Sequence, residues 1–105
     1  MGVDSHPTLT QWPHGERPTN QSLERIFLDE KLSANWWSNG PGDRYGEHSH
    51  HYYKVLYCAR GSIRFVCDGE AIDLTPGDRL DIPPGVEHSA VVGPLGVTCV
   101  EAARR

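Results

Sequence analysis

Hydrophobic and polar residues alternate in short runs along most of the chain, and turn-forming residues separate these runs. The longest alternation covers residues 48–59, where every second residue falls on the same face of a strand. Because a period of two is typical of β-structure, we expect about eight or nine strands of about five residues each and no helix. The expected strands cover residues 25–28, 32–37, 48–59, 63–67, 71–74, 79–82, 88–92 and 97–102.

Turn signals follow most of these runs. Asp68-Gly69 is a two-residue hairpin signal, and the stretches 75–78, 83–85 and 93–96 are rich in Pro and Gly. The 11 Gly and 8 Pro among 105 residues disfavour a helical bundle. Turns about every 8–12 residues are typical of a sandwich or barrel. The sequence therefore predicts an all-β jelly-roll barrel in a single domain.

The first part of the chain differs from the rest. Residues 1–20 are polar, rich in Pro, Thr and Gln, and show no periodicity. We therefore expect a flexible N-terminal arm over residues 1–20 and the barrel over residues 21–105.

Charge and composition exclude several classes of function. The net charge of -4 and the absence of a basic stripe argue against nucleic-acid binding. No apolar run reaches the roughly 20 residues that cross a bilayer, and the first residues do not resemble a secretory signal. Three widely spaced cysteines, Cys58, Cys67 and Cys99, are typical of buried free thiols in a reducing compartment. We expect a cytoplasmic protein that binds a small molecule and contacts neither nucleic acid nor membrane.

The histidines are the candidate metal ligands of this sequence. Three of the six histidines, His48, His50 and His51, lie within four positions. Residues i and i+2 of a strand share a face, so His48 and His50 are expected to converge while His51 points away. His88 follows a Pro-Pro-Gly turn and is the other histidine of the expected barrel. Three imidazoles from these positions predict a metal site.

Two spaced motifs resemble those of the cupin superfamily. The first cupin motif reads G-x5-H-x-H-x3/4-E-x6-G, and Gly42, His48, His50 and Gly61 match it. The second reads G-x5-P-x-G-x2-H-x3-N, and it is matched by Gly77, Pro83, Gly85 and His88. Two positions depart from the family pattern: Lys54 stands in place of the glutamate, and Val92 in place of the asparagine.

The resemblance implies a double-stranded β-helix barrel that forms a homodimer. It also implies that His48, His50 and His88 bind a divalent transition metal, which imidazole ligands alone do not identify among Zn, Ni, Fe, Mn and Cu. Lys54 is the candidate catalytic residue, although an ammonium cannot replace a carboxylate ligand. Either three histidines suffice for the metal, or Lys54 acts in its neutral form as a base or ligand, or the metal is lost and Lys54 binds an anion. In a fourth interpretation, a bulge rotates Lys54 outward to solvent.

Three functions remain open at this point. The first is a small metal-binding cupin, with oxygenase-, isomerase- or hydrolase-type chemistry on a small molecule. The alternative is a non-catalytic ligand-binding or sensory cupin in which Lys54 contacts an anionic ligand. The third is a structural dimer with a vestigial site. We also expect one of Trp36 and Trp37 to face the pocket, because neighbouring strand residues point to opposite faces.

Overall fold

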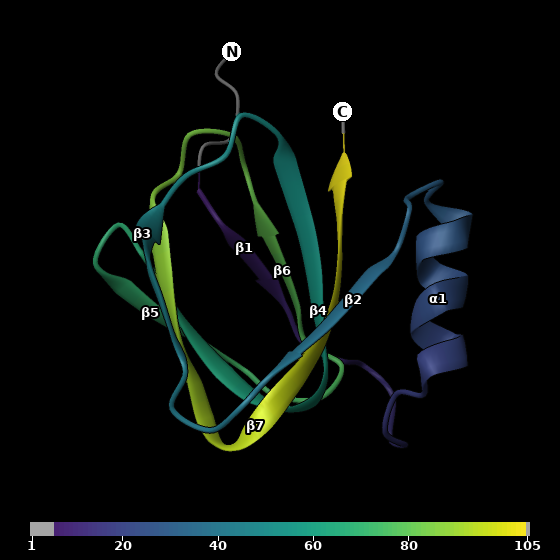
Figure 1. The fold of residues 1–105 in the computed structure, drawn as a ribbon. Helices are drawn as coiled ribbons and strands as arrows, with labels where there is room; N and C mark the ends of the chain where they lie inside the picture. Colours follow the sequence, from purple (N-terminus) through teal and green to yellow (C-terminus); the bar gives the residue numbers. More distant parts are fainter. Residues whose placement is uncertain (1–5, 105) are drawn as a thin grey trace.

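The computed structural model describes residues 6–104, so the expectations for residues 1–5 and 105 lie outside the described part. Within these residues, seven strands and one helix form a barrel with the helix packed on its outside (Figure 1). All strand pairs are antiparallel, which confirms the predicted fold class. The elements are β1 (Thr8–Thr10), α1 (Asn20–Asp29), β2 (Asn35–Asn39), β3 (Arg44–His48), β4 (Tyr53–Cys67), β5 (Glu70–Leu74), β6 (Arg79–Ile82) and β7 (His88–Arg104).

Two long strands, β4 and β7, organise the sheet. They pair with each other from Tyr53 to Cys67, and the sheet order is β1-β6-β4-β7-β2, with β3 added to β7 and β5 to β4. The expected strands 48–59 and 63–67 were wrong as separate elements, because β4 starts at Tyr53 and runs on through Gly61. Likewise, the expected strands 88–92 and 97–102 are parts of β7.

Glycines allow these long strands to bend around the barrel. Gly61 and Gly96 have φ angles of 78° and 81°, in the left-handed region. A Cβ atom on Gly61 would lie 2.0 Å from the carbonyl oxygen of Gly96. The two strands therefore approach each other here at a distance that only glycine permits.

The helix α1 contradicts the strand expected at residues 25–28. Thr19 accepts a hydrogen bond from the Ser22 amide, and the Ser22 hydroxyl accepts one from the Thr19 amide, forming a capping box at the start of the helix. Leu23, Ile26 and Phe27 then follow at helical spacing, so one face of the helix packs against the barrel. The apolar residues recur here with the spacing of a helix. The four residues 25–28 alone are too few to show this spacing.

The expected N-terminal arm is in part an edge strand. Thr8–Thr10 pairs with β6, and the Trp12 amide donates a hydrogen bond to Asp78 at 3.2 Å. Trp12 also packs against the buried cluster beneath α1. The division of the chain at residue 20 stays a prediction.

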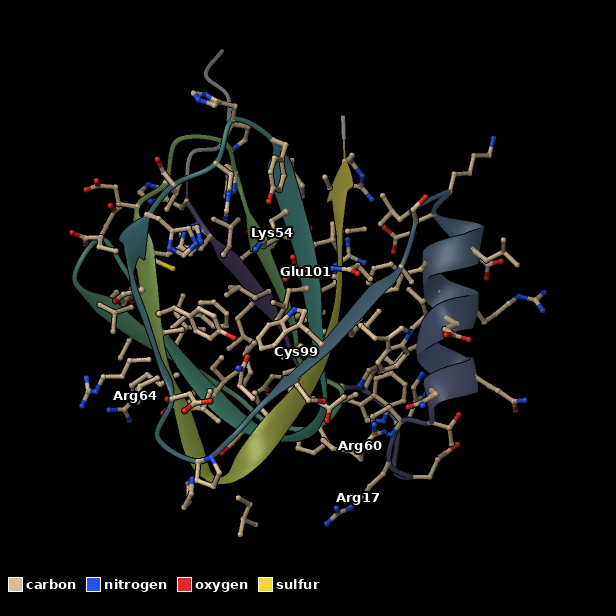
Figure 2. The ribbon with its side chains drawn as sticks, viewed as in Figure 1. Arg17, Lys54, Arg60, Arg64, Cys99 and Glu101 are labelled. Atoms are coloured by element: carbon tan, nitrogen blue, oxygen red, sulfur yellow. The ribbon has the colours of Figure 1, made fainter. Side chains whose placement is uncertain are left out.

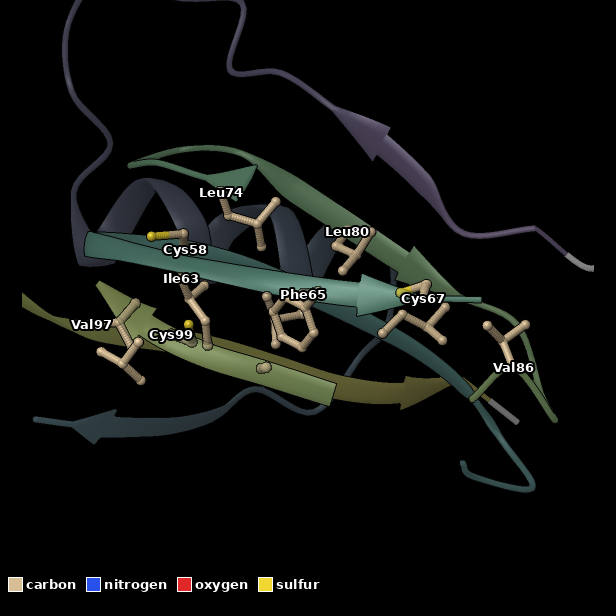
Figure 3. Close-up of a cluster of buried hydrophobic side chains, with 13 residues drawn as sticks. Cys58, Ile63, Phe65, Cys67, Leu74, Leu80, Val86, Val97 and Cys99 are labelled. Carbon is tan, nitrogen blue, oxygen red and sulfur yellow. The ribbon is translucent and has the colours of Figure 1, made fainter. Parts of the chain in front are cut away.

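The barrel has a buried cluster on each face of β4. The inner cluster includes Leu56, Cys58 and Phe65, and Cys99 reaches the same interior from β7 (Figures 2 and 3). The outer cluster places alternate β4 residues, Val55 among them, beneath α1. This confirms the predicted alternation, and all three cysteines are buried and free as expected. Within residues 6–104, no helix is long and apolar enough to cross a membrane.

Candidate metal centre

Three histidines converge at one end of the barrel. His48 ends β3 and is the register partner of His88 at the start of β7. His50 lies in the loop before β4, and its backbone carbonyl accepts a hydrogen bond from the Gly85 amide at 2.9 Å. The potential ligand atoms of the three histidines lie within 4.8 Å of one another. The expectation that His48 and His50 share a strand was wrong, because His48 ends β3 and His50 lies in the loop that follows. His51 is exposed.

Backbone carbonyls set the tautomer of two of these rings. The Nδ1 atoms of His48 and His88 lie 2.8 and 2.9 Å from the carbonyl oxygens of Gly46 and Val86. Since a carbonyl only accepts, each Nδ1 carries a proton, and Nε2 is the nitrogen on which the neutral form of either ring has its lone pair. This is the arrangement by which outer hydrogen bonds orient histidine ligands of metals.

Two buried nitrogens lack a partner within the described chain. The Nε2 atoms of His50 and His88 are buried and have no hydrogen-bond partner. A buried polar atom without a partner costs about 1–3 kcal/mol, so this arrangement is expected where a ligand completes the site. Three imidazole nitrogens fit a divalent transition metal.

The surroundings favour the neutral form of these rings. Burial is the main cause that lowers the pKa of His50 to about 4, and the nearby charges of Lys54, His88 and His48 contribute to this shift. Burial likewise lowers the pKa of His88. Both rings are therefore neutral at neutral pH, the form that binds metal.

Lys54 faces the same interior. It pairs with Ile82 of β6 on one side and Ala103 of β7 on the other, with no bulge at this position. Its residue exposure is 9%, so the interpretation that a bulge turns Lys54 outward was wrong. Its Nζ atom lies 3.4 Å from Oε1 of Glu101, and Figure 2 shows both side chains within the barrel.

Glu101 is the charged residue that the sequence analysis missed. It is the register partner of Leu56, whose side chain belongs to the inner cluster. Val97 and Cys99 also belong to the inner cluster, so a period of two along β7 puts Glu101 on this face. The signal was present in residues 97–102, which were correctly expected to be extended.

A cavity of about 240 Å³ lies between the histidine cluster and the Lys54–Glu101 pair. Three aromatic rings form part of its wall, while His48, His88, Lys54 and Glu101 supply polar groups; the aromatic residues are Trp37, Tyr45 and Phe65. The Trp37 indole N–H donates to Oε1 of Glu101 at 2.9 Å. The expectation that one of the two tryptophans faces inward is confirmed, because Trp36 packs on the outer cluster instead.

The antiparallel barrel and its histidine cluster together define a cupin. Residues 38–98 match the family model of the AraC-like ligand binding domain, which covers more than half of the chain. The chain belongs to this family. The three clustered histidines, His48, His50 and His88, all lie within the matched residues.

Individual relatives extend this comparison. The quercetin 2,3-dioxygenase of Bacillus subtilis (strain 168) is 33% identical over 99 residues, which cover 77% of this chain and 29% of that protein. This chain thus spans less than a third of that relative. An RmlC-like cupin from Shewanella frigidimarina NCIMB 400 has a TM-score of 0.62 and 30% identity over 69% of this chain and 64% of its own. The DMSP lyase DddQ of Ruegeria pomeroyi DSS-3 shares the fold with a TM-score of 0.65, at 23% identity over 70% of this chain and 38% of that one.

Proposed function

We propose that the protein is a metal-dependent cupin that acts on a small molecule in the cavity beside its histidine cluster. His48, His50 and His88 would hold one divalent transition metal. The observation that carries this proposal is the pair of buried, unpartnered Nε2 atoms of His50 and His88 close to a third imidazole. Imidazole ligands suit Zn, Ni, Fe, Mn and Cu alike.

Oxygenase-type chemistry is the reaction class that we favour over isomerase- and hydrolase-type chemistry. Support comes from the dioxygenase among its relatives, although this chain spans only 29% of that protein. A divalent ion held by three protein ligands supplies Lewis acidity toward a substrate oxygen. The backbone carbonyls of Gly46 and Val86 keep two imidazoles oriented for that ion.

Lys54 is the proposed catalytic residue. Its ammonium lines the same cavity as His48 and His88, so it can donate a hydrogen bond to a substrate oxygen that gains negative charge. The surrounding aromatic wall limits water around this group, which strengthens such an interaction. Glu101 balances the charge of Lys54 in this setting.

A non-catalytic ligand-binding module is the second candidate. The observation that favours it is the family match itself, since the matched family is described as a ligand binding domain. In that case Lys54 would contact an anionic ligand, and no metal would be needed.

We further propose that the protein works as a homodimer in the cytoplasm and binds neither nucleic acid nor membranes. Three buried free thiols support a reducing compartment. The net charge of -4 supports a partner other than nucleic acid.

Elemental analysis of untagged protein tests the metal proposal. We expect about one equivalent of transition metal in the wild type and less than about a tenth in His48→Ala and His88→Ala. His51→Ala is the matched control, since His51 is exposed and outside the cluster. A wild-type protein that stays below about a tenth of an equivalent even after reconstitution would contradict the proposal and favour the ligand-binding module.

A further inference from the structure

The charges inside the cavity are balanced only while no metal is bound. Among the described residues that line it, Lys54 and Glu101 are the ionic pair. A divalent ion on three neutral imidazoles would add two positive charges without a carboxylate ligand to offset them. Such a cavity favours a negatively charged occupant.

Lys54 and Glu101 are loosely paired. Their atoms are 3.4 Å apart, whereas charge-assisted N–H···O bonds are typically about 2.7–2.9 Å long. The Lys54 side chain is only 11% exposed, and Glu101 is its one ionic partner within residues 6–104. An ammonium has three donors, so a buried lysine with one distant partner retains the capacity to bind further oxygen atoms.

Glu101 has a second donor that would remain if Lys54 moved to another partner. Its Oε1 atom accepts the Trp37 indole N–H at 2.9 Å, a shorter contact than the one to Lys54. The carboxylate is therefore anchored to β2 independently of the lysine. An incoming anion can take the ammonium without leaving Glu101 free of hydrogen bonds.

We propose that a small organic carboxylate with a planar apolar body binds in this cavity by replacing Glu101 as the ionic partner of Lys54. The carboxylate pairs with the ammonium, and the planar body lies against the aromatic wall of Trp37, Tyr45 and Phe65. Glu101 is a positioning residue that holds Lys54 until the ligand arrives. This inference names the substrate class of the proposed function and rests on it for the additional charge of the metal.

Benzoate, with benzamide as its neutral counterpart, is the probe for this site. Isothermal titration of both compounds into zinc-loaded and metal-free protein measures the preference for the anion. We expect Lys54→Met to weaken benzoate binding about 10–100-fold and to change benzamide binding by less than about twofold. Lys31→Met is the matched control, because Lys31 is the only other lysine in the sequence and is exposed.

Glu101→Gln separates competition from structural support. If Glu101 competes with the ligand for Lys54, its neutral replacement tightens benzoate binding, whereas a purely structural role would weaken it. The double variant Lys54→Met/Glu101→Gln removes both charges and leaves no unpaired ion. We expect it to bind benzoate as weakly as Lys54→Met does. Because it leaves no buried ion unpaired, it also provides this test if Lys54→Met folds poorly.

The outcomes distinguish this inference from the proposed function. Equal affinity for benzoate and benzamide, no detectable benzoate binding, or unchanged binding after Lys54→Met would overturn the inference while the metal content stands. A protein unable to hold metal would reject the metal-dependent function. Lys54-dependent benzoate binding by that protein would still support the exchange of ionic partners at Lys54, but it would overturn the contribution of the metal charge.

Discussion

His48 and His88 face each other across the β3–β7 pair, and their ring centroids are 4.3 Å apart. Their contact depends on the register of two strands that lie far apart in the sequence. His50 joins them from the loop that leads into β4, with ring centroids 4.8 and 5.1 Å away. The proposed metal site therefore lies where three segments of the barrel meet.

His88→Leu is expected to separate metal binding from folding. The replacement loses the hydrogen bond to the Val86 carbonyl but also removes the buried, unpartnered Nε2 atom. These effects oppose each other, so the free energy of unfolding of metal-free protein should change by less than about 1 kcal/mol. The stabilisation by added Zn²⁺, about 2.7 kcal/mol at a concentration of 100 times Kd, should be lost.

Urea unfolding with and without Zn²⁺ measures both effects. His51→Ala should retain the full stabilisation by the metal, since His51 lies outside the cluster. An equal response of His88→Leu and the wild type to Zn²⁺ would show that this histidine is not a ligand.

We expect the bend in β4 to require glycine at position 61. Gly61→Ala would place a methyl group 2.0 Å from the backbone oxygen of Gly96, and backbone cannot move aside as a flexible side chain can. We expect a loss of at least about 3 kcal/mol in the free energy of unfolding. Gly69→Ala is the matched control, because its φ of +82° is similar but no atom lies within 4 Å of the added carbon.

This control should lose only about 1–2 kcal/mol, the cost of a left-handed backbone for alanine. Chemical denaturation of the two variants gives the comparison. Similar losses in both would mean that backbone conformation, and not the close approach of β4 and β7, sets the need for glycine.

Most of the barrel could be predicted from alternation and turn chemistry. β6 and the Asp68-Gly69 hairpin occur where they were expected, because each depends on a few neighbouring residues. The continuity of β4 through Gly61 could not be predicted in the same way. A glycine followed by a new apolar run is typical of a turn, and only pairing with β7 shows that it is a bend.

The candidate site also combines residues that local sequence predicts with residues that only strand pairing brings together. Motif spacing identified the three histidines, although the reason given for two of them was wrong, since the loop after β3 interrupts the expected strand. Motif spacing could not identify Glu101, which lies outside both motifs and becomes part of the site through the β4–β7 register. For Lys54, the sequence left inward and outward orientations open, and pairing on both sides of β4 decided between them.

Glu30 is expected to couple the helix to the barrel in a pH-dependent way. It follows α1 and accepts hydrogen bonds from Arg79 of β6, at 2.5 and 3.1 Å, and from Arg104 of β7, at 2.5 Å. The hydrogen bond with Arg79 lowers the pKa of Glu30 below its ordinary value of 4.5, although partial burial opposes this shift. Glu30→Gln should therefore reduce the free energy of unfolding by about 1–2 kcal/mol at neutral pH.

The sign of the pH dependence follows from the lowered pKa. The folded state favours the ionised carboxylate, so Glu30 stabilises the protein above pH 4.5 and loses this effect as the pH falls through its folded pKa. The difference in stability between wild type and Glu30→Gln should be constant from about pH 6 to 8 and should shrink below about pH 4.5. Asp73→Asn is the control, because Asp73 pairs with Arg64 on the exposed surface and should contribute less. Urea unfolding across this range measures the difference, and a gap that stayed constant into acid would show that Glu30 acts by packing and not by its charge.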